Sequence, residues 1–222
     1  MATVRTAQAL PATEYVERDL GRLPDRPSSL LPLEQFKRLV QDGMKADLIN
    51  GVMIVATPAS YTHERLFGFL MNLVSLYAEE KGLGVVLGSR SLVEAGPRSG
   101  YEPDLCFVAQ DRLDIINETS ITGPPDLVVE IISPSTRQFD AYAKKEGYAR
   151  LGVPEYWLID PDNRVVAFYR LTESGYVEGP VEDGVYHSLA VPGLWLRLDW
   201  LWDHPKVADC LRELSEMPKP LH

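Results

Sequence analysis

The apolar residues of this chain lie in short runs, and the length of these runs limits what the chain can fold into. The longest, Asp126-Leu-Val-Val-Glu-Ile-Ile132, has the length of a buried strand. A helix that spans a bilayer needs about 20 apolar residues, which is far more. The N-terminal residues also lack the apolar core of a secretory signal. We therefore expect a cytoplasmic protein without membrane contact, whose core is built partly from strands.

Size and composition predict one compact domain. The chain has 222 residues, of which 45% are hydrophobic and 24% are charged, as in ordinary folded proteins. Residues 1–31 carry balanced charges and three prolines but few apolar side chains, which indicates an N-terminal arm before a domain at 32–222. Cys106 and Cys210 form neither a disulfide framework nor a zinc knuckle, as expected in a reducing compartment.

The charge restricts the class of partner. A formal net charge of −10 disfavours broad, non-specific binding to nucleic acid, which requires a basic surface. It leaves room for an enzyme that contacts phosphate at a single metal-charged site, because the carboxylates of such a site add to the negative charge.

Apolar periodicity and turn signals predict alternating helices and strands. We expect helices at 32–40, at 61–81 before Gly82, at 136–151 before Gly152, and at about 205–214. The pair Asn50-Gly51 predicts a hairpin over 45–55. Further strands are expected at 84–93, 102–108, 126–132, 156–159, 164–171, 175–179 and 185–190. This order indicates a mixed α/β (α+β) domain with one sheet and helices packed against it.

Two acidic residues interrupt apolar segments. Asp104 follows Pro103 at the mouth of one expected strand, and Glu130 lies inside the run 126–132. Burying an acid among β-branched residues is costly unless the acid is paired or binds a cation. Two neighbouring strands would bring both carboxylates to one point and form the oxygen-rich pocket that Mg²⁺ or Mn²⁺ prefers. A turn role for Asp104 and an ion pair between Glu130 and Lys144 are the structural alternatives.

Other polar residues are candidates for the same site. Asp140 and Lys144 are four residues apart on an expected helix, and Asp47 and His63 belong to the early hairpin and the helix after it. Taken alone, Asp140 and Lys144 make an ordinary helix-stabilising pair, and His63 fits a capping role as well as a catalytic one.

Taken in order, these segments resemble the Uma2 family of endonucleases over about residues 32–200. The resemblance rests on Leu33-Glu-Gln-Phe36, Asp47-Leu-Ile-Asn-Gly51, Pro58 to His63, Glu102-Pro-Asp104, Pro125-Asp-Leu-Val-Val-Glu130, Ser133-Pro-Ser-Thr136, the spaced Asp140, Lys144 and Tyr148, and Gly152-Val-Pro-Glu-Tyr-Trp-Leu-Ile-Asp-Pro161.

The resemblance implies a restriction-endonuclease-like fold of the PD-(D/E)xK superfamily, a central mixed sheet flanked by helices. It implies that Asp104 and Glu130 hold Mg²⁺ or Mn²⁺, with the backbone carbonyl of Ile131 as a third ligand and Asp47 as an outer one. Lys144 would orient the attacking water or stabilise charge on the phosphate, with Asp140 holding the lysine in place. His63 would orient groups around the metal or carry a proton.

The sequence departs from the family pattern at several positions. The superfamily lysine is expected two residues after the acid of the second motif, where this chain has Ile132, and the family places it at Lys144 instead. Asp47 stands where the family often has Glu, and Val52 where it has a further acid. Gly147, inside a helix, costs about 1 kcal/mol of helix stability relative to alanine.

The sequence therefore predicts a metal-dependent endonuclease that hydrolyses phosphodiester bonds, with DNA favoured over RNA and a homodimer expected. Two alternatives stay open. One is a nuclease-fold protein that has lost turnover and acts as a dimeric binding or regulatory protein. The other is a metal-dependent hydrolase of a small phosphoester.

Overall fold

The computed structural model describes residues 30–40, 44–133 and 139–216. For residues 139–141 it describes the backbone alone. The N-terminal arm expected at 1–31 lies almost wholly outside the described residues, so it stays a prediction. The elements that follow it agree with the sequence up to residue 81. They are helix α1 (Leu33–Leu39), the hairpin β1 (Ala46–Ile49) and β2 (Val52–Val55), and helix α2 (Tyr61–Lys81). Asn50 and Gly51 both have positive φ, 51° and 85°, as a type I′ turn requires.

Local signals set the ends of α2. The Ser60 hydroxyl accepts a hydrogen bond from the backbone N–H of His63, so it caps the first turn. Gly82 ends the helix in the left-handed conformation at φ 61°. Both ends agree with the predicted range, and the N-terminal end places His63 in the first turn.

A six-stranded mixed sheet forms the centre of the domain, in the order β10-β9-β8-β7-β6-β3. Its strands are β3 (Gly84–Gly88), β6 (Leu105–Ala109), β7 (Leu127–Ile131), β8 (Glu155–Asp160), β9 (Val165–Thr172) and β10 (Gly175–Glu178). Strand β6 runs antiparallel to β7, whereas β7 and β8 are parallel. The connection between β7 and β8 contains a π-helix, η2 (Phe139–Lys144), which continues into α3 (Lys145–Leu151).

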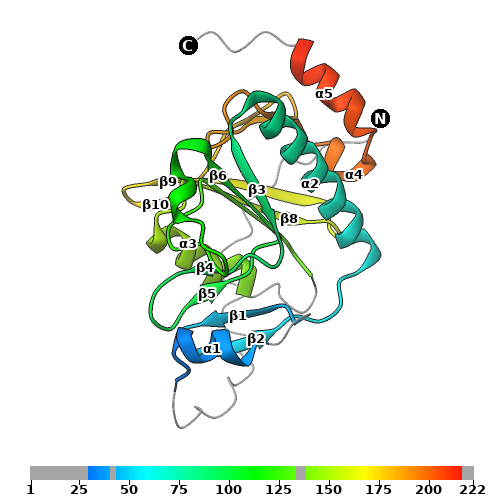
Figure 1. The fold of residues 1–222 in the computed structure, drawn as a ribbon. Coiled ribbons are helices and arrows are strands. Elements are labelled where there is room, and N and C mark those ends of the chain that lie inside the picture. The colour runs from blue at the N-terminus through cyan, green and yellow to red at the C-terminus, as the bar shows by residue number, and fades with distance from the viewer. Residues whose placement is uncertain (1–29, 41–43, 134–138, 217–222) are drawn as a thin grey trace.

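Helices and small sheets surround this centre (Figure 1). A four-stranded sheet, β2-β1-β5-β4, adds β4 (Val93–Glu94) and β5 (Gly100–Tyr101) to the hairpin. A three-stranded sheet contains β11 (Val181–Glu182), β12 (Val185–His187) and β13 (Trp195–Arg197). The remaining helices are the 3₁₀-helix η1 (Gln110–Ile115), α4 (Trp200–Asp203) and α5 (Val207–Glu216).

The central sheet has an apolar core on each face. On one face, Leu66, Leu70 and Leu73 of α2 pack against residues such as Phe107 and Trp157. Figure 1 shows α2 lying along this face, with the hairpin and α1 below it. On the other face the core is rich in tyrosine and contains Tyr101, Cys106, Val128, Tyr148 and Tyr156. Because both faces are buried, β6 and β7 read as continuous apolar runs.

The fold class agrees with the expectation, a mixed α/β domain with a central mixed sheet and helices against it, and the described residues add two smaller sheets. Two expectations about single elements were wrong. The segment 84–93 is not one strand, because the N–H groups of Arg90 and Ser91 turn back to the carbonyl of Gly88 and β4 then joins a different sheet. The last helix begins at Val207, and the shorter α4 precedes it. The start of the helix expected at 136–151 lies outside the described residues, and the described part begins as a π-helix.

Within the part of the chain that the structure describes, no helix has the length and apolar character needed to cross a bilayer.

Candidate active site

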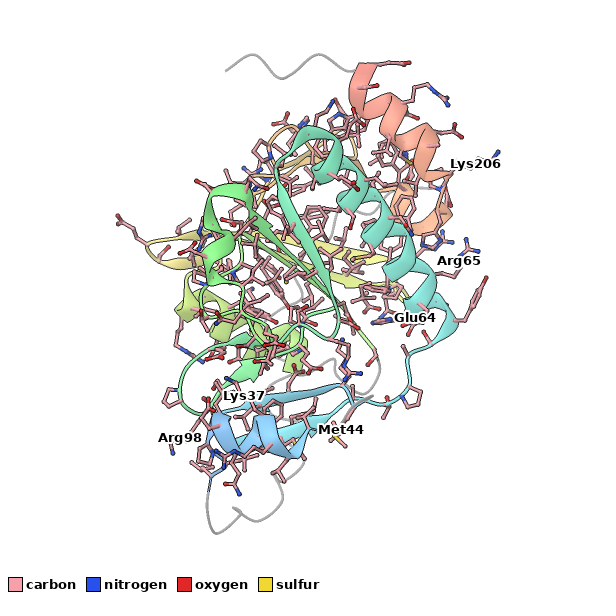
Figure 2. The ribbon with its side chains drawn as sticks, in the orientation of Figure 1. Lys37, Met44, Glu64, Arg65, Arg98 and Lys206 are labelled. Carbon is pink, nitrogen blue, oxygen red and sulfur yellow. The ribbon has the colours of Figure 1, made fainter. Side chains whose placement is uncertain are left out.

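The predicted acidic residues meet in a pocket of about 310 Å³ between the hairpin, the start of α2 and the central sheet. Its charged lining consists of Lys45, Asp47, His63, Glu64, Asp104, Glu130 and Lys144. In Figure 2, Glu64 marks the first turn of α2, above the hairpin. Residues from five separate segments therefore face one cavity.

Asp104 lies just before β6 and is 2% exposed. Its Oδ2 accepts a hydrogen bond from the backbone N–H of Ile131 at 2.7 Å and lies 3.3 Å from Nε2 of His63. Its Oδ1 lies 2.5 Å from Nζ of Lys45. Burial acts to raise the pKa of Asp104, but the hydrogen bond from His63 and the charge of Lys45 outweigh it and hold the pKa well below its usual range. This carboxylate is therefore ionised at neutral pH.

Glu130, in the neighbouring strand β7, is 1% exposed. Its Oε1 accepts hydrogen bonds from Nζ of Lys144 and from the Tyr148 hydroxyl, both at 2.9 Å. Lys144 is itself 2% exposed and reaches Oδ2 of Asp47 at 2.8 Å. The ammonium group is thus held between two carboxylates, which offsets the large cost of burying it.

Asp47 and Glu102 connect the hairpin to the sheet. Oδ1 of Asp47 accepts the backbone N–H of Glu102 at 2.8 Å, and Oε2 of Glu102 accepts the backbone N–H of Ala46 at 3.2 Å. Burial raises the pKa of Glu102 to about 7, an effect that the hydrogen bond from Ala46 partly opposes. These reciprocal contacts fix the position of β1 relative to the segment that leads through Asp104 into β6.

His63 and Lys45 place positive charge beside Asp104. Burial acts to lower the pKa of both side chains, but the carboxylate of Asp104 more than compensates and raises both values. His63 also lies 3.3 Å, through Nδ1, from Oε1 of the exposed Glu64. The raised pKa favours the protonated form of His63, so this side chain can hold a proton at the pocket.

The structure brings together Asp47, His63, Asp104, Glu130 and Lys144, with Ile131 beside them through its backbone. The side chain of Asp140 lies outside the described residues, so its predicted contact with Lys144 stays a prediction.

Sequence reasoning missed the site positions of Lys45 and Glu102. A period of two along the hairpin strand places Lys45 on the same side as Asp47, and this signal could have identified it. Glu102 carries no comparable signal, because its partner Ala46 is 56 positions away in the sequence.

The oxygen donors fit a divalent cation that is shared with a substrate. Mg²⁺ is commonly bound through one or two carboxylates together with substrate phosphates and waters, and Asp104 and Glu130 supply two carboxylates. Among the described residues, no group of three or more His, Cys, Asp or Glu side chains is placed to hold a metal ion.

The fold is a central mixed sheet flanked by helices, with one acid just before β6, another in the neighbouring β7 and a lysine beside them. This combination defines a restriction-endonuclease-like protein. The chain belongs to the Uma2 family, described as "Putative restriction endonuclease", whose profile matches residues 33–199.

Two known proteins are similar to this chain, one in sequence and one in fold. The chain is 27% identical over 161 residues to the uncharacterized protein sll1609 of Synechocystis sp., covering 72% of this chain and 80% of that protein. Its fold is similar to the crystal structure described as a putative nuclease belonging to DUF820 from Anabaena variabilis, with a TM-score of 0.66 at 18% identity. That match covers 78% of this chain and 98% of the other, so the shared fold includes nearly all of the solved protein.

Proposed function

We propose that this protein is a metal-dependent endonuclease that hydrolyses phosphodiester bonds of nucleic acid, with DNA as the favoured substrate. One observation carries the proposal: two buried carboxylates, Asp104 just before β6 and Glu130 in the adjacent β7, meet two lysines in one pocket of a restriction-endonuclease-like fold. The description of the Uma2 family supports the reaction class. The family's restriction-type description also favours DNA over RNA.

In this proposal Asp104 and Glu130 hold Mg²⁺ or Mn²⁺, with the carbonyl of Ile131 beside them. When bound, such a cation polarises a phosphoryl oxygen and lowers the pKa of a bound water. Lys144 supplies a fixed positive charge next to Glu130, where it stabilises the negative charge that builds up on the phosphate.

We assign Asp47 a positioning role in this proposal, where the resemblance implies an outer metal ligand. Both of its oxygens are engaged, one by Lys144 and the other by the backbone of Glu102. Asp47 therefore positions the ammonium group of Lys144 and does not serve as a metal ligand in this proposal. His63 shares Asp104 with Lys45, so it is placed to orient that carboxylate and to hold a proton.

Calorimetric titration of Mn²⁺ tests the metal site directly. We expect saturable binding to the wild type and its loss in Asp104→Asn and Glu130→Gln, which remove one charged ligand each with little change of shape. Asp111→Asn is the matched control, because Asp111 is an exposed acid on η1 outside the pocket. Binding that survives both pocket substitutions would contradict the proposed site.

A cleavage assay then tests the activity. Supercoiled plasmid, linear duplex, RNA and a small phosphodiester are incubated with Mg²⁺ or Mn²⁺, and light scattering on the same samples measures whether the protein is the expected homodimer. Metal-dependent cutting of DNA that Lys144→Met abolishes supports the proposal. Turnover of the small ester alone would instead identify a small-phosphoester hydrolase, and metal binding without any turnover would favour a binding protein.

A further inference from the structure

Lys45 is a second lysine of the pocket, and its surroundings differ from those of Lys144. Its side chain is 26% exposed, whereas that of Lys144 is 2% exposed and is held between two carboxylates. Its backbone is fixed, because the carbonyl of Lys45 accepts the N–H of Ala56 and extends the hairpin pairing. Lys45 is therefore a long, partly solvated side chain whose backbone is held by the hairpin.

Lys45 occupies the oxygen of Asp104 that a cation would need. Oδ2 of Asp104 is already engaged by the backbone of Ile131 and by His63. Oδ1 has Lys45 as its hydrogen-bond partner among the described residues. A divalent cation bound to Asp104 would repel the ammonium group from this position, because like charges at contact distance are unfavourable even in a partly solvated site.

The charge balance of the pocket indicates where Lys45 goes. Asp47, Asp104 and Glu130 carry three negative charges, and Lys45 and Lys144 carry two positive ones. With His63 neutral and the exposed Glu64 left out of the count, the described lining has one net negative charge. A dication changes this to one net positive charge. That charge complements one phosphodiester group, which carries a single negative charge.

We propose that Lys45 is a substrate-binding residue that leaves Asp104 when a divalent cation binds and then contacts a phosphate of the polynucleotide. This inference rests on the proposed nuclease function and adds to it a residue that neither the sequence motifs nor the superfamily lysine supplies. In the absence of a cation, Lys45 serves as the counter-charge of Asp104, so it competes with the metal for the same oxygen.

This exchange predicts that removing the charge of Lys45 changes the affinity for metal and the affinity for nucleic acid in opposite directions. In Lys45→Met, the affinity for Mn²⁺ measured by calorimetry is expected to rise about threefold or more, because a competing positive charge is removed. In Ca²⁺, with a short fluorescent duplex followed by anisotropy and checked for intact length, the same variant is expected to bind about tenfold more weakly. The slope of log affinity against log salt concentration should fall by about 0.9, the contribution of one phosphate contact.

Lys37→Met is the matched control. Lys37 also lies 2.5 Å from a carboxylate, Oε1 of Glu94, and its side chain is 24% exposed. Lys37 belongs to α1 and lies well apart from Glu64 in Figure 2, so its removal should change neither measurement. Lys45→Arg keeps the charge and should keep the salt slope.

The outcomes separate this inference from the proposed function. A wild type that binds no Mn²⁺ overturns the proposed function and this inference with it. A wild type that binds Mn²⁺ and duplex, with both affinities unchanged in Lys45→Met, overturns the role of Lys45 alone. A parallel loss of both affinities in Lys45→Met also overturns it, because that result indicates a structural role for the ion pair with Asp104.

Discussion

Replacing Gly147 by alanine is expected to destabilise the fold, although alanine is the better helix former. Gly147 lies in α3, where it faces the buried ring of Tyr101. A Cβ atom added there would overlap the hydroxyl oxygen of Tyr101 and lie 2.7 Å from its Cζ and 2.8 Å from its Cε2. The ring cannot easily move, because Tyr101 is 1% exposed and packs edge-on against Tyr148 at 5.1 Å between centroids.

The expected change in unfolding free energy is the difference between two effects. Helix propensity favours alanine by about 1 kcal/mol. Overpacking a buried site costs about 1–3 kcal/mol. The upper end applies here because the added Cβ would lie too close to three atoms of the Tyr101 side chain. We therefore expect Gly147→Ala to lose about 2 kcal/mol of stability.

Urea denaturation followed by circular dichroism measures this difference, and Gly68 provides the matched control. Gly68 lies inside α2 with no atom within 4 Å of the added Cβ, so Gly68→Ala should gain about 0.5–1 kcal/mol. Adding Tyr101→Phe to Gly147→Ala should recover part of the loss, because it removes the atom that overlaps most. If Gly147→Ala stabilises the protein as Gly68→Ala does, the packing argument is refuted.

Three further predictions concern buried polar groups. Burial raises the pKa of Glu102 to about 7 from an ordinary 4.5, so the folded state holds a proton that the unfolded state releases between these values. The unfolding free energy should therefore fall by about 3 kcal/mol as the pH rises from 4.5 to 7. Thermal melts of Glu102→Gln over this pH range should lack this loss, and a variant with the same pH dependence as the wild type would contradict the raised pKa of Glu102. Glu155 is fully buried and accepts hydrogen bonds from Trp157 Nε1, from the Ser188 hydroxyl and from the backbone N–H groups of Leu189 and Ala190. Glu155→Gln should lower the unfolding free energy by about 2–3 kcal/mol in urea melts, because the N–H₂ group of the glutamine would face hydrogen-bond donors. A loss below about 1 kcal/mol would show that the segment 188–190 rearranges. Burial raises the pKa of Cys106 to about 12 and that of Cys210 to about 11, so neither thiol should react with a disulfide reagent at pH 8 until the protein is unfolded, and rapid labelling of the native protein would oppose this.

The local parts of the fold could be predicted from sequence because their signals are local. The Asn50-Gly51 turn and the Gly82 end of α2 each depend on a few neighbouring residues, and the structure confirms both. The division of 84–93 between two sheets could not be predicted, because it depends on pairing of β4 with β5 and not on the segment itself.

The same distinction holds for the pocket. Asp104 and Glu130 were recognisable because acids inside apolar strands are unusual, and the antiparallel pairing of β6 with β7 brings their strands together as expected. Lys45 was missed because its partner Asp104 is 59 positions away in the sequence. The cost that Gly147 imposes on its helix was visible in the sequence, but its reason, the ring of Tyr101, was not.

The parallel pairing of β7 with β8 also determines when the pocket can form during synthesis of the chain. A parallel pair needs a crossover, and Lys144 belongs to that crossover, so its place beside Glu130 is fixed only after β8 has joined the sheet. Synthesis starts from the N-terminus, so the hairpin with Lys45 and Asp47 leaves the ribosome about 100 residues before Lys144 does. A nascent chain that stops short of Asp160 therefore carries the acids without the held lysine. Whatever chemistry the pocket performs, it begins only on a completed domain.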